Sequence, residues 1–411
     1  MFTVTPESLD GCDLNSQHFT LFCPHLMNPF DLHLRTRMVF GAGSINRVGE
    51  LTAEKAGSGC RALVVTDPGI IAAGHHGRAV ASLHAADIET QTFDGAHENP
   101  TTRDVNAGLE IATAFKPDIL IGLGGGSSMD CAKGINFLYS CGGQMSDYHG
   151  VGLATADMLP MIAIPTTAGT GSELQSFALI SDADTHVKMA CGDKRASCSI
   201  AILDPETTLT QPPAVTALTG IDALSHAVET WVTTRRGTIS RLYSRAAWEL
   251  LAPNFAKVLD SPGDLAARSA MQVGAAWAGL AIENSMLGAS HALANPLTAT
   301  FRTPHGQAVG LVLPHVVRFN GVEVDSLYRE LLRVTEHLPG MPSSSSGSEG
   351  LADFLTHQVA AAKLQTRLSD LGVSEEQLPA LSAAAAGQWT AGFNPRVVDA
   401  ASLLKIYQSA F

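Results

Sequence analysis

The sequence is poor in positive charge, has no long apolar run, and has no cysteines at metal-binding spacing. Its 411 residues include 26 Lys and Arg against 39 Asp and Glu, a net charge of −13. A chain without a basic stripe lacks the electrostatic footprint of a nucleic-acid binder, and anionic membrane surfaces would repel it. No uninterrupted apolar run approaches the roughly 18 residues that span a bilayer. We therefore expect neither a nucleic-acid-binding protein nor a membrane protein.

Seven scattered cysteines, never spaced C-x-x-C, argue against a disulfide framework and against a thiolate metal site. They favour a reducing, cytoplasmic environment. Residues 1–29 contain no Lys or Arg, so we expect no secretion signal and treat this stretch as an N-terminal extension. With 45% hydrophobic residues, the remaining length can build two domains.

The first half alternates short apolar runs with helical patterns. The runs that predict strands are Arg61–Thr66, Asp118–Leu123, Met161–Ile164 and Ser199–Leu203. A helix is predicted from Asp104 to Phe115. Because these strands are continuously apolar, they indicate a parallel sheet covered by helices on both faces. We expect an α/β dinucleotide-binding domain over residues 30–212.

The second half has long Ala- and Leu-rich segments at helical spacing, without β-branched runs. The predicted helices are Ala214–Val232, Ile239–Leu259, Leu265–Glu283, Val324–Leu338 and Leu351–Leu371. Pro212-Pro213 marks the boundary, because a proline pair continues neither a strand nor a preceding helix. Pro342–Ser348 is expected to be a surface loop. We expect residues 213–411 to form an all-helical metal- and substrate-binding domain.

Two loops that follow predicted strands suit a nucleotide. Gly124-Gly-Gly-Ser-Ser-Met-Asp130 joins a strand to a helix, where free N–H groups cradle phosphate oxygens. It lacks the lysine of a P-loop, so triphosphate hydrolysis is not expected. The second loop, Pro165-Thr-Thr-Ala-Gly-Thr-Gly-Ser172, could line a dinucleotide cleft at the carboxyl edge of the sheet. Asp67, after an earlier strand, suits the ribose hydroxyls of NAD and would repel the extra phosphate of NADP. Each of these loops also has a purely structural interpretation as a turn.

The second half contains one carboxylate and three imidazoles that suit a metal ion. Asp222 and His226 are spaced i, i+4 on a predicted helix, so both project from one face. His291 and His305 follow in the same half. Such oxygen and nitrogen donors suit a divalent transition metal with coordination positions left open for substrate. An Asp/His pair on a helix is more often a hydrogen-bonded pair than half a metal site.

At these residues the chain resembles the iron-containing (group III) alcohol dehydrogenases, whose fold is shared with dehydroquinate synthase. The resemblance runs from about Phe40 to the C-terminus. It rests on six ordered motifs: Val65-Thr-Asp67, Asn99-Pro-Thr101, Gly124–Asp130 with Ala132-Lys133, Pro165–Thr170, Gly220-Ile-Asp-Ala-Leu-Ser-His226 and Thr303-Pro-His-Gly306.

The resemblance implies roles for individual residues. It assigns a metal, usually Fe²⁺, to Asp222, His226, His291 and His305. Zn²⁺, Co²⁺ and Ni²⁺ accept the same ligands. It places Asp67 on the ribose of NAD. The implied pyrophosphate contacts are Gly125, Gly126, Ser127 and Asp130, and the other implied cofactor contacts are Asn99, Thr166, Thr167, Thr170 and Lys188.

One position departs from the family pattern. Many members have a histidine four residues after the one that matches His291, and this chain has Asn295. An amide can hydrogen-bond but does not exchange a proton near neutral pH, so this departure bears on the proton-relay or substrate-contact role of the position. The four metal ligands are intact, which argues against the related maleylacetate reductases.

We hypothesise reversible hydride transfer between a small alcohol and NAD, with NADP as the other possible cofactor and the metal as a Lewis acid. A hydroxyacid–oxoacid transhydrogenase and a dehydroquinate synthase-like lyase are alternatives, although Arg302 is the only evident cation near the metal loops for a phosphate-bearing substrate. A non-catalytic sensing module is a further alternative. Phe177, Met286, Asn295 and Phe301 are expected pocket residues, and the resemblance implies a homodimer or higher homo-oligomer.

Overall fold

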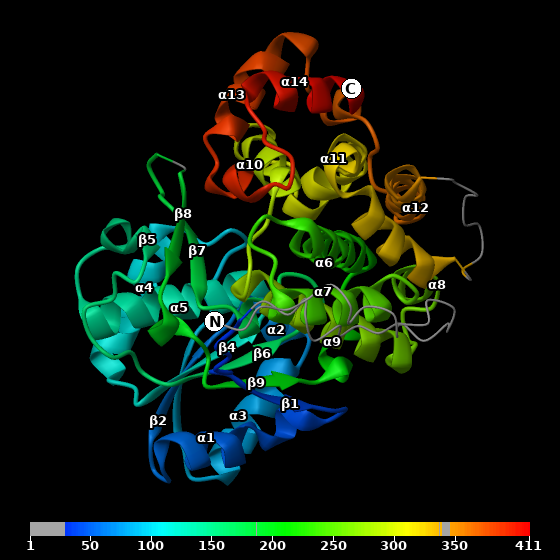
Figure 1. Cartoon of the computed structure of the whole chain (residues 1–411). Coiled ribbons are helices and arrows are strands. Elements are labelled where there is room, and N and C mark those ends of the chain that lie inside the picture. Colours follow the sequence, from blue (N-terminus) through cyan, green and yellow to red (C-terminus); the bar gives the residue numbers. More distant parts are fainter. Residues whose placement is uncertain (1–28, 186, 337, 339–345) are drawn as a thin grey trace, which may run out of the picture.

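The computed structural model describes residues 29–185, 187–336, 338 and 346–411. Figure 1 shows a sheet-containing N-terminal half and a helical C-terminal half. The predicted extension (apart from its last residue) and most of the predicted loop at 342–348 lie outside the described residues. No helix of the described part is long and apolar enough to cross a membrane.

The N-terminal half is built on a six-stranded sheet in the order β1-β9-β6-β4-β2-β3, and all its strand pairs are parallel. Its strands are β1 (Arg37–Phe40), β2 (Arg61–Val65), β3 (Glu89–Phe93), β4 (Ile119–Gly124), β6 (Met161–Pro165) and β9 (Ile200–Leu203). A smaller sheet contains β5 (Gly150–Val151), β7 (Phe177–Ser181) and β8 (Lys188–Gly192). The helices of this half are α1 (Val48–Ala56), α2 (Pro68–Ala72), α3 (His75–Ala85), α4 (Thr102–Phe115) and α5 (Gly126–Cys141).

Helices cover both faces of the large sheet, because successive strand residues point to opposite sides. In β2, Leu63 joins the core beneath α4 and α5, whereas Val64 joins the core beneath α1 and α3. The expected α/β fold with a doubly covered parallel sheet is therefore confirmed.

The C-terminal half is helical, as expected. Its helices are α6 (Pro213–Val232), α7 (Thr238–Leu251), α8 (Phe255–Asp260), α9 (Leu265–Glu283), α10 (Ala289–Phe301), α11 (His305–Thr335), α12 (Gly347–Ala361), α13 (Leu378–Ala386) and α14 (Ala400–Ser409). Trp231 on α6 and Trp248 on α7 lie in its main core, and each indole donates a hydrogen bond to a carbonyl of α11.

Three predicted helices have different bounds in the structure. The single helix predicted over 239–259 is two helices, because Pro253 lacks an N–H group and its ring clashes with the preceding turn. The helix predicted from Val324 is the last part of the longer α11, which has a kink at Val324. The helix predicted over Leu351–Leu371 is shorter at its C-terminal end, because α12 ends at Ala361.

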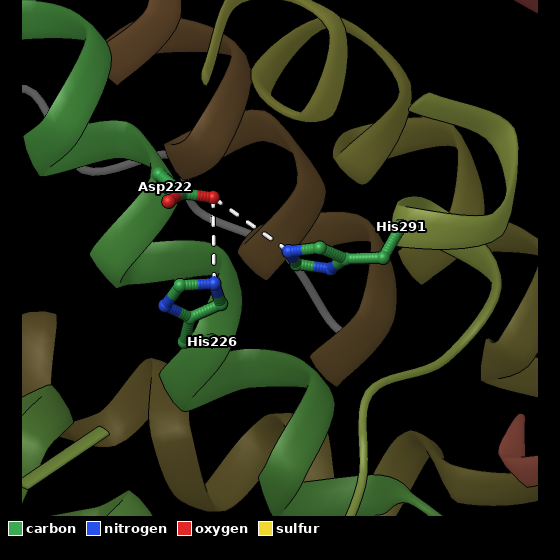
Figure 2. Close-up of side chains that lie close together, drawn as sticks. All are labelled: Asp222, His226 and His291. Carbon is green, nitrogen blue, oxygen red and sulfur yellow. Dashed lines mark ion pairs between the residues drawn. The ribbon is translucent and has the colours of Figure 1, made fainter. Parts of the chain in front are cut away.

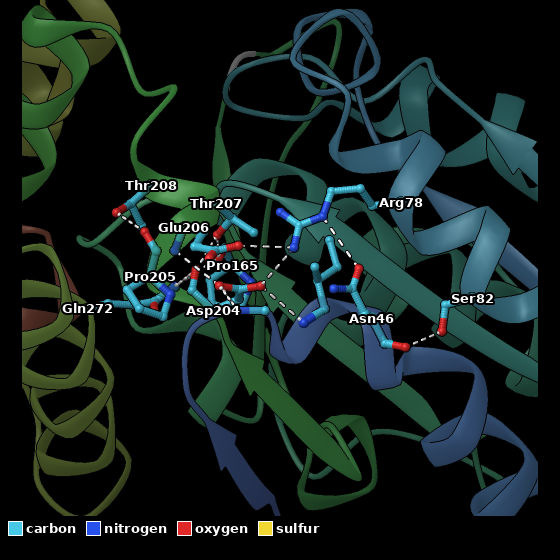
Figure 3. Close-up of polar contacts among 12 residues, drawn as sticks. Asn46, Arg78, Ser82, Pro165, Asp204, Pro205, Glu206, Thr207, Thr208 and Gln272 are labelled. Atoms are coloured by element: carbon cyan, nitrogen blue, oxygen red, sulfur yellow. Dashed lines mark hydrogen bonds and ion pairs between the residues drawn. The ribbon is translucent and has the colours of Figure 1, made fainter. Parts of the chain in front are cut away.

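The two halves meet at the carboxyl ends of β6 and β9 (Figure 3). There the Asp204 carboxylate accepts hydrogen bonds from the backbone N–H groups of Gly43 and Ile45. Gln272 of α9 donates its side-chain amide to the carbonyl oxygens of Pro165 and Asp204. Because α6 begins at Pro213, shortly after β9, we propose residues 30–212 and 213–411 as two domains.

Candidate metal and cofactor site

Asp222 and His226 lie one turn apart on α6, inside the helical domain. Their spacing directs both side chains to one face of α6, a helix that packs against α7, α9 and α11. The two residues are only 5% and 4% exposed. Burial of an unneutralised carboxylate is costly, so this pair requires compensating partners.

His291 of α10 and His305 of α11 complete the group. The Nε2 atoms of His226, His291 and His305 lie 3.4, 3.6 and 3.7 Å from Oδ1 of Asp222. Figure 2 shows the side chains of His226 and His291 directed toward Asp222. The structure thus brings together all four residues that the sequence singled out, and the side chain of His305, 26% exposed, lies on the open side.

The donor set fits a divalent metal ion. Bonds of about 2.1 Å in a tetrahedral site place neighbouring ligand atoms about 3.4 Å apart. The separations from Asp222 Oδ1 to the three Nε2 atoms are close to this value. In the described part of the chain, the ligand atoms of Asp222, His226 and His291 all lie within 4.8 Å of one another, and His305 joins this group through its contact with Asp222. Among the described residues, neither Asp222 Oδ1 nor His291 Nε2 has a hydrogen-bond partner, although both atoms are buried. Two unpartnered polar atoms aimed at each other are what a bound cation would explain.

The electrostatics of the group are strongly coupled. Burial raises the pKa of Asp222, but the three imidazoles outweigh this effect and hold the pKa well below its usual range. Burial lowers the pKa of His305 to about 3, and Lys188 acts in the same direction. A neutral imidazole is the form that binds metals.

Glu229 is a buried residue of the site that the sequence analysis missed. Its Oε2 lies 2.6 Å from Nδ1 of His291. Burial lowers the pKa of His291, but the Glu229 and Asp222 carboxylates outweigh it and raise the pKa to about 9. The spacing of the sequence could have identified Glu229, because it follows His226 by three residues on α6 and therefore lies on a neighbouring part of the same helix face.

On the sheet side, the two predicted nucleotide loops lie against each other. Gly125 precedes the first residue of α5, Gly126. A Cβ on Gly126 would lie 2.7 Å from the side chain of Thr170, and one on Gly125 would lie 3.5 Å from Thr167. The Thr166 N–H donates to the carbonyl oxygen of Gly124. At Gly126 only glycine allows this close approach, which sets the N-terminus of α5 against the threonine loop.

Asp67 lies at the carboxyl end of β2 and caps α2 by accepting a hydrogen bond from the Ile70 N–H. Its other oxygen is 3.4 Å from the hydroxyl of Ser128, on the first turn of α5. The acidic residue thus stands beside the glycine run, and its ribose contact stays a prediction.

Asn99 contacts Ser127 of the glycine run. The Asn99 N–H donates to the Ser127 hydroxyl at 3.3 Å, and the Lys188 ammonium is 3.5 Å from Asn99 Oδ1. Burial lowers the pKa of Lys188, while the carboxylates of Asp130 and Asp222 oppose that effect. Lys188 therefore contacts the nucleotide side of the site, and its charge also influences the pKa of His305 on the metal side.

Asp130 has partners other than the pyrophosphate contact that the resemblance implies. It is 8% exposed, and its two oxygens accept hydrogen bonds from the Ser172 hydroxyl and the Leu179 N–H. Lys133 is fully buried and donates to Ser172 and to the carbonyl oxygen of Phe177. Asp130 and Lys133 thus hold the segment after the threonine loop against α5.

The expected pocket residues lie in different surroundings. The Phe177 ring packs against Trp389 at 5.9 Å, which joins the small sheet to the helical half. Asn295 donates its side-chain amide to Oε1 of Gln388. Met286 is buried, and Phe301 packs against the core formed by α10, α11 and the C-terminal helices.

Comparison with known proteins agrees with this architecture. Residues 35–205 match the family model for iron-containing alcohol dehydrogenase. Residues 216–411 match the model for the C-terminal part of the Fe-containing alcohol dehydrogenase family. Together the two matches cover nearly all of the described chain.

Individual relatives are also similar along most of their length. Alcohol dehydrogenase 4 of Schizosaccharomyces pombe is 38% identical over 78% of this chain and 75% of that protein. The crystal structure of a 1,3-propanediol oxidoreductase has a TM-score of 0.89 at 31% identity, covering 93% of this chain and all of the other. Sulfoacetaldehyde reductase of Bifidobacterium kashiwanohense in complex with NAD⁺ has a TM-score of 0.83 at 28% identity, covering 93% and 99% of the chains. This chain therefore belongs to the iron-containing alcohol dehydrogenase family, whose members are oxidoreductases acting on CH–OH groups.

Proposed function

We propose that this chain catalyses the reversible, NAD-linked oxidation of a small alcohol at a divalent metal site formed by Asp222, His226, His291 and His305. The observation that carries the proposal is the convergence of three Nε2 atoms on one carboxylate oxygen, within 3.4 to 3.7 Å. A divalent ion held there would supply Lewis acidity toward the oxygen of an alcohol.

The residues themselves orient the site and limit its access to water. The side chains of Asp222, His226 and His291 are 5–7% exposed, so solvent and substrate approach on the side of His305. Lys188 acts on the pKa of His305 and also contacts Asn99 beside the glycine run. Because Lys188 is near both His305 and Asn99, we infer that the side of the metal site on which His305 lies faces the cofactor loops.

NAD is proposed as the cofactor. The N-terminus of α5 begins within the glycine run and lies against Thr170 of the threonine loop, and such a terminus binds phosphate oxygens. Asp67 beside it would hydrogen-bond a ribose and repel the extra phosphate of NADP. A relative with the same fold is described in complex with NAD⁺.

The proposed ion is Fe²⁺, on the ground of family membership, with Zn²⁺ as the other candidate for such donors. The proposed substrates are short alcohols, because relatives include a 1,3-propanediol oxidoreductase and a lactaldehyde reductase. We further propose a homo-oligomer in the cytoplasm. Five cysteines of the described part are free, which fits a reducing compartment: Cys60, Cys131, Cys141, Cys191 and Cys198.

The test is an absorbance assay for NADH with the Fe²⁺-loaded protein, a panel of short alcohols, and either NAD or NADP. We expect alcohol-dependent NADH formation that a chelator abolishes. His305→Ala should lower the rate at least about 100-fold, since losing merely a hydrogen-bond partner of a metal ligand costs about 10- to 100-fold. His149→Ala, at an exposed histidine outside the site, should not. Full activity of metal-free protein would reject the proposal.

The same assay separates the transhydrogenase and lyase alternatives. A transhydrogenase would form no net NADH from the alcohol alone, but would turn over once an oxoacid acceptor is added. A lyase would consume its substrate with no net NADH in either condition.

A further inference from the structure

Glu229 fixes the protonation state of one nitrogen of His291. The Glu229 carboxylate is 4% exposed, and its Oε2 lies 2.6 Å from His291 Nδ1. An ionised carboxylate only accepts hydrogen bonds, so Nδ1 must be the donor and carry a proton. When the His291 ring is in its neutral, metal-binding form, its lone pair is then on Nε2, the atom 3.6 Å from Asp222 Oδ1.

The second oxygen of Glu229 caps the helix that carries His291. Gly288 stands at the N-cap position of α10 and has no side chain to satisfy the first N–H groups. Glu229 Oε1 supplies the missing acceptor and takes a 2.7 Å hydrogen bond from the Ser290 N–H. A Cβ at Gly288 would lie 3.1 Å from this same oxygen, so glycine permits the close approach. One side chain of α6 therefore holds both the start of α10 and the ring of His291.

These contacts leave one polar atom without a partner. Within the described part of the chain, the buried Nε2 of His291 has no hydrogen-bond partner. We propose that Glu229 is a positioning residue that fixes the ring and tautomer of His291 so that Nε2 is free to bind the divalent cation. This inference rests on the proposed metal site and adds to it a residue that does not touch the ion.

Replacement by glutamine isolates this role. Glu229 serves two donors, Ser290 N–H and His291 Nδ1–H, with two acceptor oxygens. Glutamine has one acceptor oxygen and one NH₂ group. If the NH₂ group faced His291, Nδ1 would have to accept and the proton would move to Nε2, which blocks metal binding. If it faced Ser290, two donors would oppose each other at the start of α10.

The experiment measures the dissociation constant for Zn²⁺ by chelator competition, on metal-stripped full-length protein. We expect Glu229→Gln to bind Zn²⁺ about 10- to 100-fold more weakly than the wild type, the usual effect of losing such a partner. Glu229→Asp keeps the charge but is one methylene shorter, and this variant should bind Zn²⁺ at least about fivefold more weakly than the wild type. It provides a second test if the Gln variant fails to fold. The matched control is Glu173→Gln, another buried carboxylate, 3% exposed, which should stay within about twofold.

The outcomes separate this inference from the proposed function. If the wild type binds no Zn²⁺, or if Asp222→Asn binds as well as the wild type, the metal site itself is refuted. If the wild type binds and Asp222→Asn does not, but both Glu229 variants bind within about twofold of the wild type, the positioning role alone is overturned. Equal weakening in the Glu173→Gln control would also overturn it, because the effect would then be general to buried carboxylates.

Discussion

The side-chain amide of Gln272 donates a 3.1 Å hydrogen bond to the carbonyl oxygen of Pro165, across the junction between the two halves of the chain. The same amide lies 3.3 Å from the carbonyl oxygen of Asp204. Gln272 on α9 thus ties the helical half to the ends of β6 and β9. The threonine loop of the proposed cofactor site begins at Pro165.

We therefore expect Gln272→Leu to raise KM for NAD about five- to tenfold, since a hydrogen bond contributes about 1 kcal/mol. Steady-state kinetics with varied NAD and saturating alcohol measure the change. Gln358→Leu is the control, because Gln358 is also buried but lies on α12. Equal KM values for NAD in the wild type and Gln272→Leu would show that the tie does not position the loop.

The preference for NAD over NADP tests Asp67. Asp67→Gly should relax the preference by removing the charge, but it also removes the cap of α2. Asp67→Asn keeps a capping oxygen and removes only the charge. We expect the ratio of kcat/KM for NADP to that for NAD to rise about tenfold or more in both variants, the equivalent of about 1.4 kcal/mol. An unchanged ratio in Asp67→Asn would reject the ribose role.

The pH dependence of stability tests Glu173. Burial raises its pKa from 4.5 to about 7 in the folded chain. Because the folded state holds this proton more tightly, the group contributes stability that is fully present below about pH 4.5 and is lost as pH rises from there through about 7. The loss should reach roughly 3 kcal/mol.

Glu173→Gln should therefore be less pH-sensitive than the wild type and more stable above about pH 8. Urea unfolding at several pH values measures both chains, with Glu376→Gln, at an exposed position, as the control. If Glu173→Gln and the wild type lose stability in parallel as pH rises, Glu173 does not titrate in this way.

Asn295 stands where many relatives have a histidine, and its amide donates to Gln388 at 3.0 Å. Neither amide titrates near neutral pH. Asn295→His should add an ionisation near pH 6.5 to the pH profile of kcat, whereas Asn295→Gln should not. Measuring kcat from about pH 5.5 to about pH 8.5 would show it. Identical profiles in all three proteins would mean that this position takes no part in proton transfer.

Local patterns in the sequence were sufficient to predict the buried strands of the sheet. β2, β4, β6 and β9 are continuously apolar because both faces of the inner sheet are covered. β3 was missed because it is an edge strand with only Phe93 fully buried. A strand with few buried positions has too little apolar pattern to be identified.

The candidate site was predictable only in part. Asp222 and His226 share a helix, so their spacing alone suggested a pair, and family motifs added His291 and His305. Glu229 was not identified because its partner is 62 residues away in sequence, on α10. Acidic residues on helices usually face solvent, and only the hydrogen bonds of Glu229 with Ser290 and His291 of α10 distinguish this one.

The most direct test of the account is anomalous X-ray diffraction from a crystal of the Fe²⁺-loaded protein, at energies above and below the iron absorption edge. We predict one strong peak per chain, within bonding distance of Asp222 Oδ1 and of Nε2 in His226, His291 and His305. Absence of a peak there, or a single peak elsewhere in the chain, would contradict the proposed metal site and the function built on it.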